Sequence, residues 1–177
     1  MIHTLNTKDG SIQWDLNLGG EQQFKFFPIL IQGNIAIVPG WDETLGVSLE
    51  SGRTVWLTAG VQPLVQTEDG RALTRSHQGI ADIDWLTGEA KMLAQVDWSQ
   101  GVYRPNGGQL INDQLVVSDG LNLHGYSVTD GEALWSWAAP GTIVDNHVAV
   151  GGAIAVPVGE QKAEAPDDRR VVLIAPP

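Results

Sequence analysis

The chain has 177 residues, enough for one domain with a sizeable core, and its hydrophobic share of 42% is typical of folded globular proteins. A net charge of −11 argues against nucleic acid and anionic membrane surfaces as partners, because both bind clusters of Lys and Arg. Since the chain has no cysteine, disulfides, thiolate metal sites and cysteine nucleophiles are excluded. The 21 glycines favour short strands joined by tight turns.

The chain begins with two predicted strands, at residues 2–6 and 11–16, joined by a turn at Asp9 and Gly10. No basic segment followed by an apolar one precedes them, so the sequence predicts no signal peptide. The longest apolar stretch, residues 148–158, is interrupted by glycines and a proline, and no transmembrane segment is expected. The compartment therefore stays unknown.

A ten-residue repeat occurs four times and aligns without gaps on one glycine. The anchor glycines, which are 42, 36 and 43 residues apart, are Gly10, Gly52, Gly88 and Gly131. The residues four positions after them are Trp14, Trp56, Met92 and Trp135. A small polar residue followed by Gly predicts a hairpin turn, because Gly takes a positive φ at no steric cost. The large side chain after each turn is expected to pack between neighbouring sheets.

A second turn lies upstream of the last three repeats at a constant distance. Asn34, Gly70 and Asp113 each precede the following anchor glycine by 18 residues. Each unit is therefore predicted to contain four short antiparallel strands. In the first complete unit they are expected at residues 26–32, 35–40, 44–49 and 53–58. Four-stranded units with a period near 40 residues are typical of β-propeller blades.

The C-terminal part is predicted to add strands near residues 147–150, 153–158 and 170–175, with a polar loop at 159–168. The predicted fold is all-β: a β-propeller of about four four-stranded antiparallel blades, in one domain over residues 1–177. The blade parts are expected at residues 1–18, 23–58, 61–96, 104–138 and 142–177. The predicted total of about 17 strands exceeds what four blades need. Two interpretations stay open: half of an eight-bladed propeller completed by another chain or copy, or a closed four-bladed ring with one strand displaced.

The repeat resembles the pyrroloquinoline-quinone-like (PQQ-like) repeat, whose core reads Leu-Asp-x-x-Thr-Gly-x-x-x-Trp. Residues 83–88 (Ile-Asp-Trp-Leu-Thr-Gly) match its first half, although Met92 stands where the family has Trp. Residues 5–14 match it with Asn for the Asp and Asp for the Thr. The family includes quinoprotein dehydrogenases, the outer-membrane assembly lipoprotein and sensor domains of membrane kinases, and is often periplasmic or extracytoplasmic. The resemblance implies a propeller over essentially the whole chain and no single function.

No cofactor is expected. In the quinoprotein dehydrogenases that the repeat resembles, a vicinal Cys pair holds PQQ. This chain has no Cys, so the resemblance does not extend to a PQQ site. Asp82 and Asp84 share one face of a predicted strand and could bind Ca²⁺, although Asp84 also serves as a turn residue. The segment 46–50 resembles a nucleophile elbow but ends in Glu where Gly is required. The histidines, which lack metal-ligand spacing and are expected to be exposed or in turns, are His3, His77, His124 and His147.

Aromatic residues beside charged ones in predicted loops form the candidate binding surface. Its residues are Trp41, Asp42, Glu43, Trp98, Tyr103 and Arg104. Exposed aromatics of this kind anchor proteins or sugars. The other interpretation is that they cover the ends of the propeller core.

The sequence therefore predicts a non-catalytic propeller that serves as a platform for a protein partner or for self-association. The alternative is an enzyme, either a remnant of a quinone-dependent dehydrogenase or a propeller hydrolase with paired carboxylates. A convergent cluster of Asp, Glu and His in a central channel would favour the enzyme.

Overall fold

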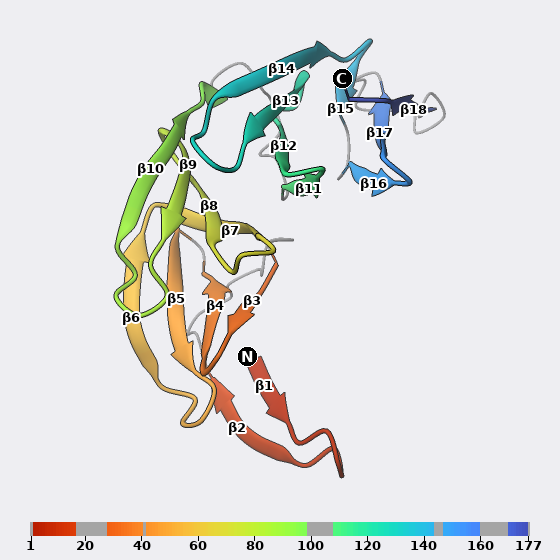
Figure 1. Ribbon diagram of the computed structural model, residues 1–177. Helices are drawn as coiled ribbons and strands as arrows, with labels where there is room; N and C mark the ends of the chain where they lie inside the picture. The colour runs from red at the N-terminus through yellow and green to blue at the C-terminus, as the bar shows by residue number, and fades with distance from the viewer. Residues whose placement is uncertain are drawn as a thin grey trace. The chain divides into compact units, whose positions relative to one another are not determined.

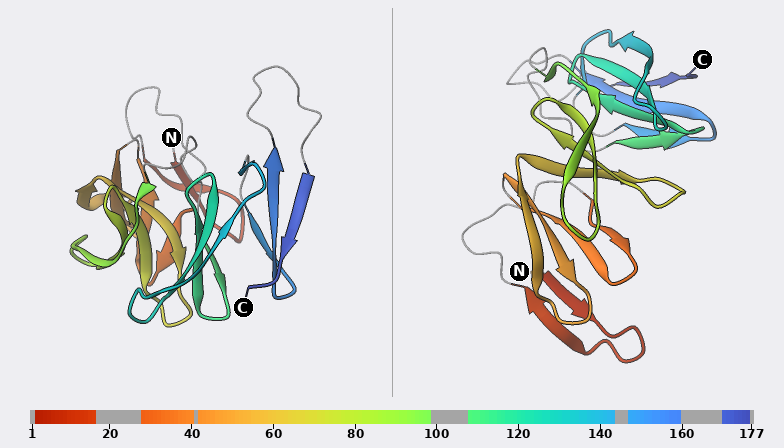
Figure 2. Two further views of the ribbon diagram at one scale, coloured as in Figure 1. Left: turned by 90° about the horizontal axis from the view of Figure 1, so that it is seen from above. Right: turned by 60° about the vertical axis from the view of Figure 1, so that its left-hand side comes forward.

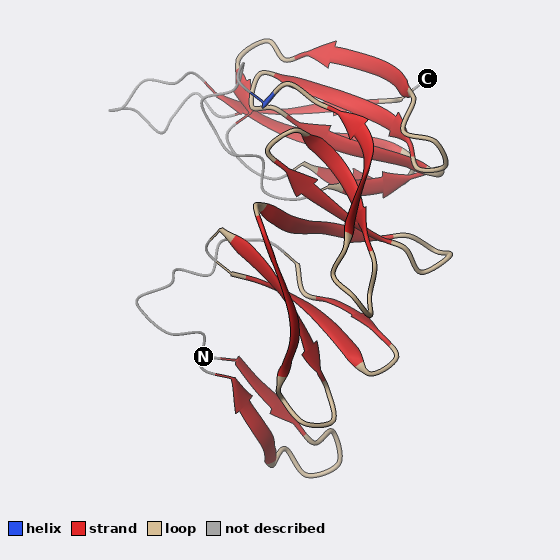
Figure 3. Ribbon diagram, turned by 90° about the vertical axis from the view of Figure 1, so that its left-hand side faces the viewer, coloured by secondary structure: helices blue, strands red, loops and turns tan. Residues whose placement is uncertain are grey.

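The computed structural model describes residues 2–16, 28–40, 42–98, 108–143, 147–159 and 170–176. Antiparallel β-sheets make up nearly all of this part of the chain (Figure 1, Figure 3). The chain divides into two compact units, Met1–His77 with Ala81–Lys91, and Gln78–Ile80 with Met92–Pro177.

The first unit opens with a hairpin of β1 (Ile2–Leu5) and β2 (Ile12–Leu16). A four-stranded sheet follows, whose strands pair in chain order. Its strands are β3 (Leu30–Gln32), β4 (Ile35–Pro39), β5 (Glu43–Ser48) and β6 (Thr54–Ala59). The predicted strands of this unit are confirmed to within a few residues, except that β3 begins at Leu30; residues 26 and 27 lie outside the described residues.

Two more four-stranded sheets follow, each again paired in chain order. The first consists of β7 (Val61–Gln66), β8 (Ala72–Ser76), β9 (Gly79–Ile83) and β10 (Ala90–Gln95). The second consists of β11 (Gln109–Ile111), β12 (Gln114–Ser118), β13 (Asn122–Ser127) and β14 (Ala133–Ala138). The strands within each sheet twist about one another, as in propeller blades (Figure 2).

The C-terminal sheet differs slightly from its prediction. Its strands are β15 (Thr142–Ile143), β16 (Val148–Val150), β17 (Ala153–Gly159) and β18 (Arg170–Ile174). β15 and β16 pair with opposite ends of β17, while β18 pairs with its other edge. The first strand of this sheet is therefore split in two, and its β15 part was not predicted. The all-β fold of successive propeller blades is confirmed, whereas the predicted blade limits stay a prediction.

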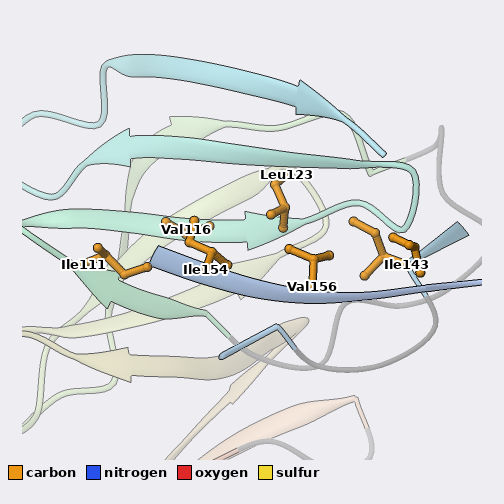
Figure 4. Packing of buried hydrophobic residues seen from close by; sticks show 7 residues of the cluster. Ile111, Val116, Leu123, Ile143, Ile154 and Val156 are labelled. Atoms are coloured by element: carbon orange, nitrogen blue, oxygen red, sulfur yellow. The ribbon is translucent and has the colours of Figure 1, made fainter. Parts of the chain in front are cut away.

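Strand β4 is buried on both of its faces, because its sheet lies between the β1–β2 hairpin and the next sheet. In β4, four of the five residues are buried, because alternate side chains enter two different clusters. Ile37 packs with Trp56, Val61 and residues of the next sheet, while Ala36 and Val38 pack towards the β1–β2 hairpin. In the second unit, residues of the β11–β14 sheet pack in the same way against the C-terminal sheet (Figure 4). The buried members of this cluster are Ile111, Val116, Leu123, Ile143, Ile154, Val156 and Val158.

The repeated tryptophans join each sheet of the first unit to the next. The indole Nε1 of Trp14 donates to the carbonyl oxygen of Leu49 (2.6 Å), and its ring covers Gly52, where an added Cβ would lie 2.7 Å from it. Trp56 repeats both contacts one sheet later: Nε1 donates to the carbonyl oxygen of Trp85 (2.8 Å), and the ring covers Gly88. In each case the acceptor carbonyl lies three residues before the covered glycine. Gly serves both as the turn residue and as the surface on which the indole packs.

The two other repeat positions differ. Met92 is 40% exposed, so it does not pack between sheets as expected for a large side chain at this position. A thioether has no N–H to donate, and the carbonyl oxygen of Leu93 already lies against Gly131, only 2.1 Å from where a Cβ would stand. The ring of Trp135 covers Gly125 of its own sheet, and its Nε1 donates to Gln114 Oε1 (2.7 Å) rather than to a carbonyl oxygen of the next sheet. Trp135 also packs against the buried cluster that its sheet shares with the C-terminal sheet.

Hydrogen bonds between the two kinds of turn explain the constant offset of 18 residues. The carbonyl oxygen of Asn34 accepts the backbone N–H of Leu49 (2.8 Å), and that of Gly70 accepts the indole Nε1 of Trp85 (2.8 Å). In the second unit the carbonyl oxygen of Asp113 accepts the backbone N–H of Val128 (3.4 Å). An insertion between the turns would break these bonds, so the offset is held fixed.

His147 gives the second unit a predicted pH dependence. It is 4% exposed, its Nε2 lies 3.1 Å from the carbonyl oxygen of Val116, and burial lowers the pKa of this imidazole below the ordinary 6.5. The folded chain therefore favours neutral His147, so stability is full above pH 6.5 and falls as the pH drops towards the lowered folded-state pKa. We expect a loss of about 1 kcal/mol between pH 7.5 and 5.5, where carboxylates stay ionised.

Urea unfolding at the two pH values measures this loss. A His147→Gln variant keeps an N–H donor without the titration, so its unfolding free energy should depend less on pH than that of the wild type. Equal pH dependence of the two proteins would show that His147 is not the group responsible.

Candidate interaction surface

Two turns of the first unit bring exposed polar side chains together. Asp42 lies in the turn between β4 and β5, and His77 lies in the corresponding turn between β8 and β9 of the next sheet. His77 Nε2 lies 3.8 Å from Asp42 Oδ1, and the two side chains are 80% and 74% exposed. Together with the half-buried Glu43, they form what we call the Asp42–His77 surface.

The backbone beneath this surface is firmly held. The N–H of Gly40 donates to the carbonyl oxygen of Glu43 (2.8 Å), which closes the β4–β5 turn. The N–H of Gly60, in the connection between β6 and β7, donates to the carbonyl oxygen of Asp42 (2.7 Å). Gly60 has φ of +71°, and an added Cβ would lie 3.4 Å from the His77 ring, so a glycine fits this connection best. Because this short turn is already held by backbone hydrogen bonds, it loses little backbone entropy when a ligand binds to its charged side chains.

The residues predicted for the binding surface fall into three groups. Asp42 and Glu43 belong to the Asp42–His77 surface. Trp98 is half-buried just after β10, at the edge of the described residues. Trp41, Tyr103 and Arg104 lie outside the described residues, so their role stays a prediction.

Sequence reasoning did not join His77 to Asp42. His77 was expected only to be an exposed or turn histidine. The signal was present in the repeat: His77 follows Asp42 by 35 residues, close to the 36 residues between Gly52 and Gly88. Residues one repeat apart occupy the same turn of neighbouring blades, and therefore meet at one edge.

The corresponding turn of the second unit is a structural motif. Asp119 is 3% exposed, and its carboxylate accepts the backbone N–H groups of Leu121 and Asn122 and the Nδ2 of Asn122. It also lies 3.0 Å from His124 Nε2. Burial opposes the charged form, but the hydrogen bonds from Asn122, His124 and the backbone outweigh it and lower the pKa of Asp119. This carboxylate is committed to holding the β12–β13 turn.

The proposed Ca²⁺ ligands already have protein partners. Asp82 Oδ2 accepts a hydrogen bond from the Nε–H of Arg71 (2.7 Å). Asp84 Oδ1 accepts hydrogen bonds from the backbone N–H of Leu86 and from both the backbone N–H and the hydroxyl of Thr87. The hydrogen bonds from Thr87 and Leu86 lower the pKa of Asp84. Both residues border an open hollow of about 440 Å³, whose other lining residues are Glu89, Ala90 and Lys91.

Within the described ranges, no group of three or more His, Cys, Asp and Glu side chains is placed to hold a metal ion. The same ranges contain no helix with the length and apolar character to cross a membrane. The expectations of no cofactor and of no catalytic role stay predictions.

No family model and no curated protein matches the chain. Solved propeller structures do match its fold. BamB from Moraxella catarrhalis is 16% identical, with 83% of this chain and 47% of BamB covered and a TM-score of 0.59. A chain of the structure of BBS1N in complex with ARL6DN is 19% identical, with 83% and 52% covered and a TM-score of 0.57. A chain of the mitotic checkpoint complex is 9% identical, with 97% and 57% covered and a TM-score of 0.68.

The chain thus spans about half the length of these three structures. At 9–19% identity the similarity concerns the fold alone. The resemblance to PQQ-like repeats is supported in this coarser form: the chain consists of β-propeller blades similar to those of BamB and of other propellers.

Proposed function

We propose that the chain is a non-catalytic platform that binds a protein partner at the Asp42–His77 surface. The observation that carries this proposal is the joining of two exposed side chains, from neighbouring blades, on turns fixed by backbone hydrogen bonds. Rigid blades that present short polar turns suit the recognition of another protein, because binding needs little reordering. Two of the similar propeller structures were solved as parts of protein complexes, which agrees with such a role.

The charge of the surface indicates the chemistry of the partner. Asp42 and Glu43 are consecutive in the sequence, and the chain as a whole carries a net charge of −11. An electrostatic field of this sign attracts a basic segment and speeds its association. We therefore expect the partner to contribute Lys or Arg side chains, with binding that weakens as salt rises. The neighbouring Trp41 is the predicted aromatic anchor.

Photo-crosslinking tests this proposal. A photo-crosslinking residue at position 77 should form an adduct with one predominant protein of the source cell, and Asp42→Lys should reduce the adduct at least about tenfold. Glu50→Lys is the matched control: it makes the same charge change at the other end of β5, on an exposed turn. The proposal fails if Glu50→Lys reduces the adduct as much, or if a crosslinker at position 50 captures the same protein equally well.

A further inference from the structure

The C-terminal sheet exposes a continuous apolar face. Val148 and Val150 of β16 are 51% and 55% exposed, and Val171 and Leu173 of β18 are 66% and 69% exposed. Val150 pairs with Ala153, Val148 with Ala155, and Leu173 with Ala155, which places them all on one face. The opposite face, with Ile154 and Val156, packs against the β11–β14 sheet. We call the four exposed residues the C-terminal patch.

The first unit exposes a second apolar patch. Ile29, just before β3, and Ile31, within it, are 48% and 54% exposed. Leu30 between them packs against the β7–β10 sheet, so Ile29 and Ile31 point to the other side. Ile31 pairs with Ala36, whose face is covered by the β1–β2 hairpin. Ile29 and Ile31, the N-terminal patch, thus extend a blade face that the hairpin covers only in part.

The repeat shows what normally covers such faces. Within the first unit, the first strand of one sheet lies beside the first strand of the next, β3 beside β7. The second unit repeats this with β11 beside β16. By the same rule, β16 should lie beside the first strand of a following blade. The N-terminal patch lies on a first strand whose preceding blade supplies only β1 and β2 among the described residues.

We infer that the C-terminal patch of one copy packs against the N-terminal patch of a second copy, with β16 beside β3. The two patches are aliphatic, lie on opposite faces of their blades and belong to strands that the repeat rule places side by side. The chain also matches about half of each propeller named above, so two copies supply the length of one. Used twice between the same two copies, this head-to-tail contact covers both patches of each copy.

The native mass of the 177-residue chain, measured by light scattering after size exclusion, tests this inference. We expect a species near 38 kDa, twice the 19.0 kDa of one chain. Each copy carries a charge of −11, so screening by salt should strengthen the association, the opposite of the salt effect expected at the Asp42–His77 surface. A wild-type mass of 19 kDa at tens of micromolar would overturn the inference. A chain that covers its own patches would also give this mass, and it would likewise overturn the inference.

Single charges separate this contact from unspecific adhesion. Val150→Asp and Ile31→Asp alter residues of nearly equal exposure, 55% and 54%, one in each patch. Each should raise the dissociation constant at least about a hundredfold, because a carboxylate would be buried without a partner. Leu86→Asp, at a 77% exposed turn residue outside both patches, should leave the mass at 38 kDa.

Mixing the two variants guards against loss by misfolding. Val150→Asp keeps its N-terminal patch and Ile31→Asp keeps its C-terminal patch, so an equimolar mixture retains one of the two contacts. The mixture should regain part of the two-copy species, which neither variant forms alone. No recovery, or equal loss with Leu86→Asp, would overturn the inference.

Discussion

Replacing Trp56 with Ala is expected to lower the free energy of unfolding by about 3–5 kcal/mol. Trp56 is 8% exposed and packs with residues of two sheets. Its ring fills the space above Gly46 and Gly88, and neither glycine has a side chain that could move into the cavity left behind. The variant also leaves the carbonyl oxygen of Trp85 without the indole donor at 2.8 Å. Cavity formation and the lost hydrogen bond therefore add.

Met92→Ala is the matched control, because Met92 occupies the same repeat position but is 40% exposed. It should cost about 1 kcal/mol, since less apolar surface leaves the core. Trp56→Phe should fall between the two, because it keeps an aromatic ring and removes the N–H donor. Urea unfolding followed by far-ultraviolet circular dichroism measures all three without relying on tryptophan fluorescence. Equal losses in Trp56→Ala and Met92→Ala would show that the indole does not join the sheets.

The repeat made most of the fold predictable. The offset of 18 residues between Asn34 and Gly52 is fixed by a hydrogen bond from Leu49 to Asn34, so the sequence carries a direct trace of a tertiary contact. The alternation of turns and short apolar runs located the strands of the first blade to within a few residues. Local chemistry and long-range contact agree at these positions, which is why pattern reasoning works there.

The exceptions depend on contacts that a single repeat does not contain. β15 consists of two residues, and it is a strand only because Thr142 and Ile143 pair with the far end of β17. The exposure of Met92 follows from Leu93, whose carbonyl oxygen occupies the surface of Gly131 where an indole would pack. Neither effect can be read from a ten-residue pattern, because both are decided by residues on another strand.

The candidate site was predictable only in part. Asp42 and Glu43 were identified as charged loop residues, but the approach of His77 depends on the register between neighbouring blades. The sequence left open whether another chain or copy completes the propeller, and it did not locate the two apolar patches. Which residues form them follows from the face that each strand turns away from its neighbour. The side-chain direction of Ile31 or Val150 is set by pairing, with a period of two residues, rather than by composition.

Gly88→Ala is expected to destabilise the chain by about 2–5 kcal/mol, the sum of a backbone cost and a steric one. Gly88 has φ of +72°, and an added Cβ would lie 2.6 Å from the Trp56 ring and 2.8 Å from Thr58 Oγ1. Gly33→Ala isolates the backbone cost, because Gly33 has φ of +57° with no atom within 4 Å of an added Cβ, and it should lose about 1–2 kcal/mol. The difference between the two variants, measured by urea unfolding, is the penalty of displacing the indole. That difference should become smaller when both are made in a Trp56→Ala background, because only the contact with Thr58 Oγ1 then remains. An unchanged difference without Trp56 would mean that the glycine turn, and not the packing of tryptophan on it, is what the repeat preserves.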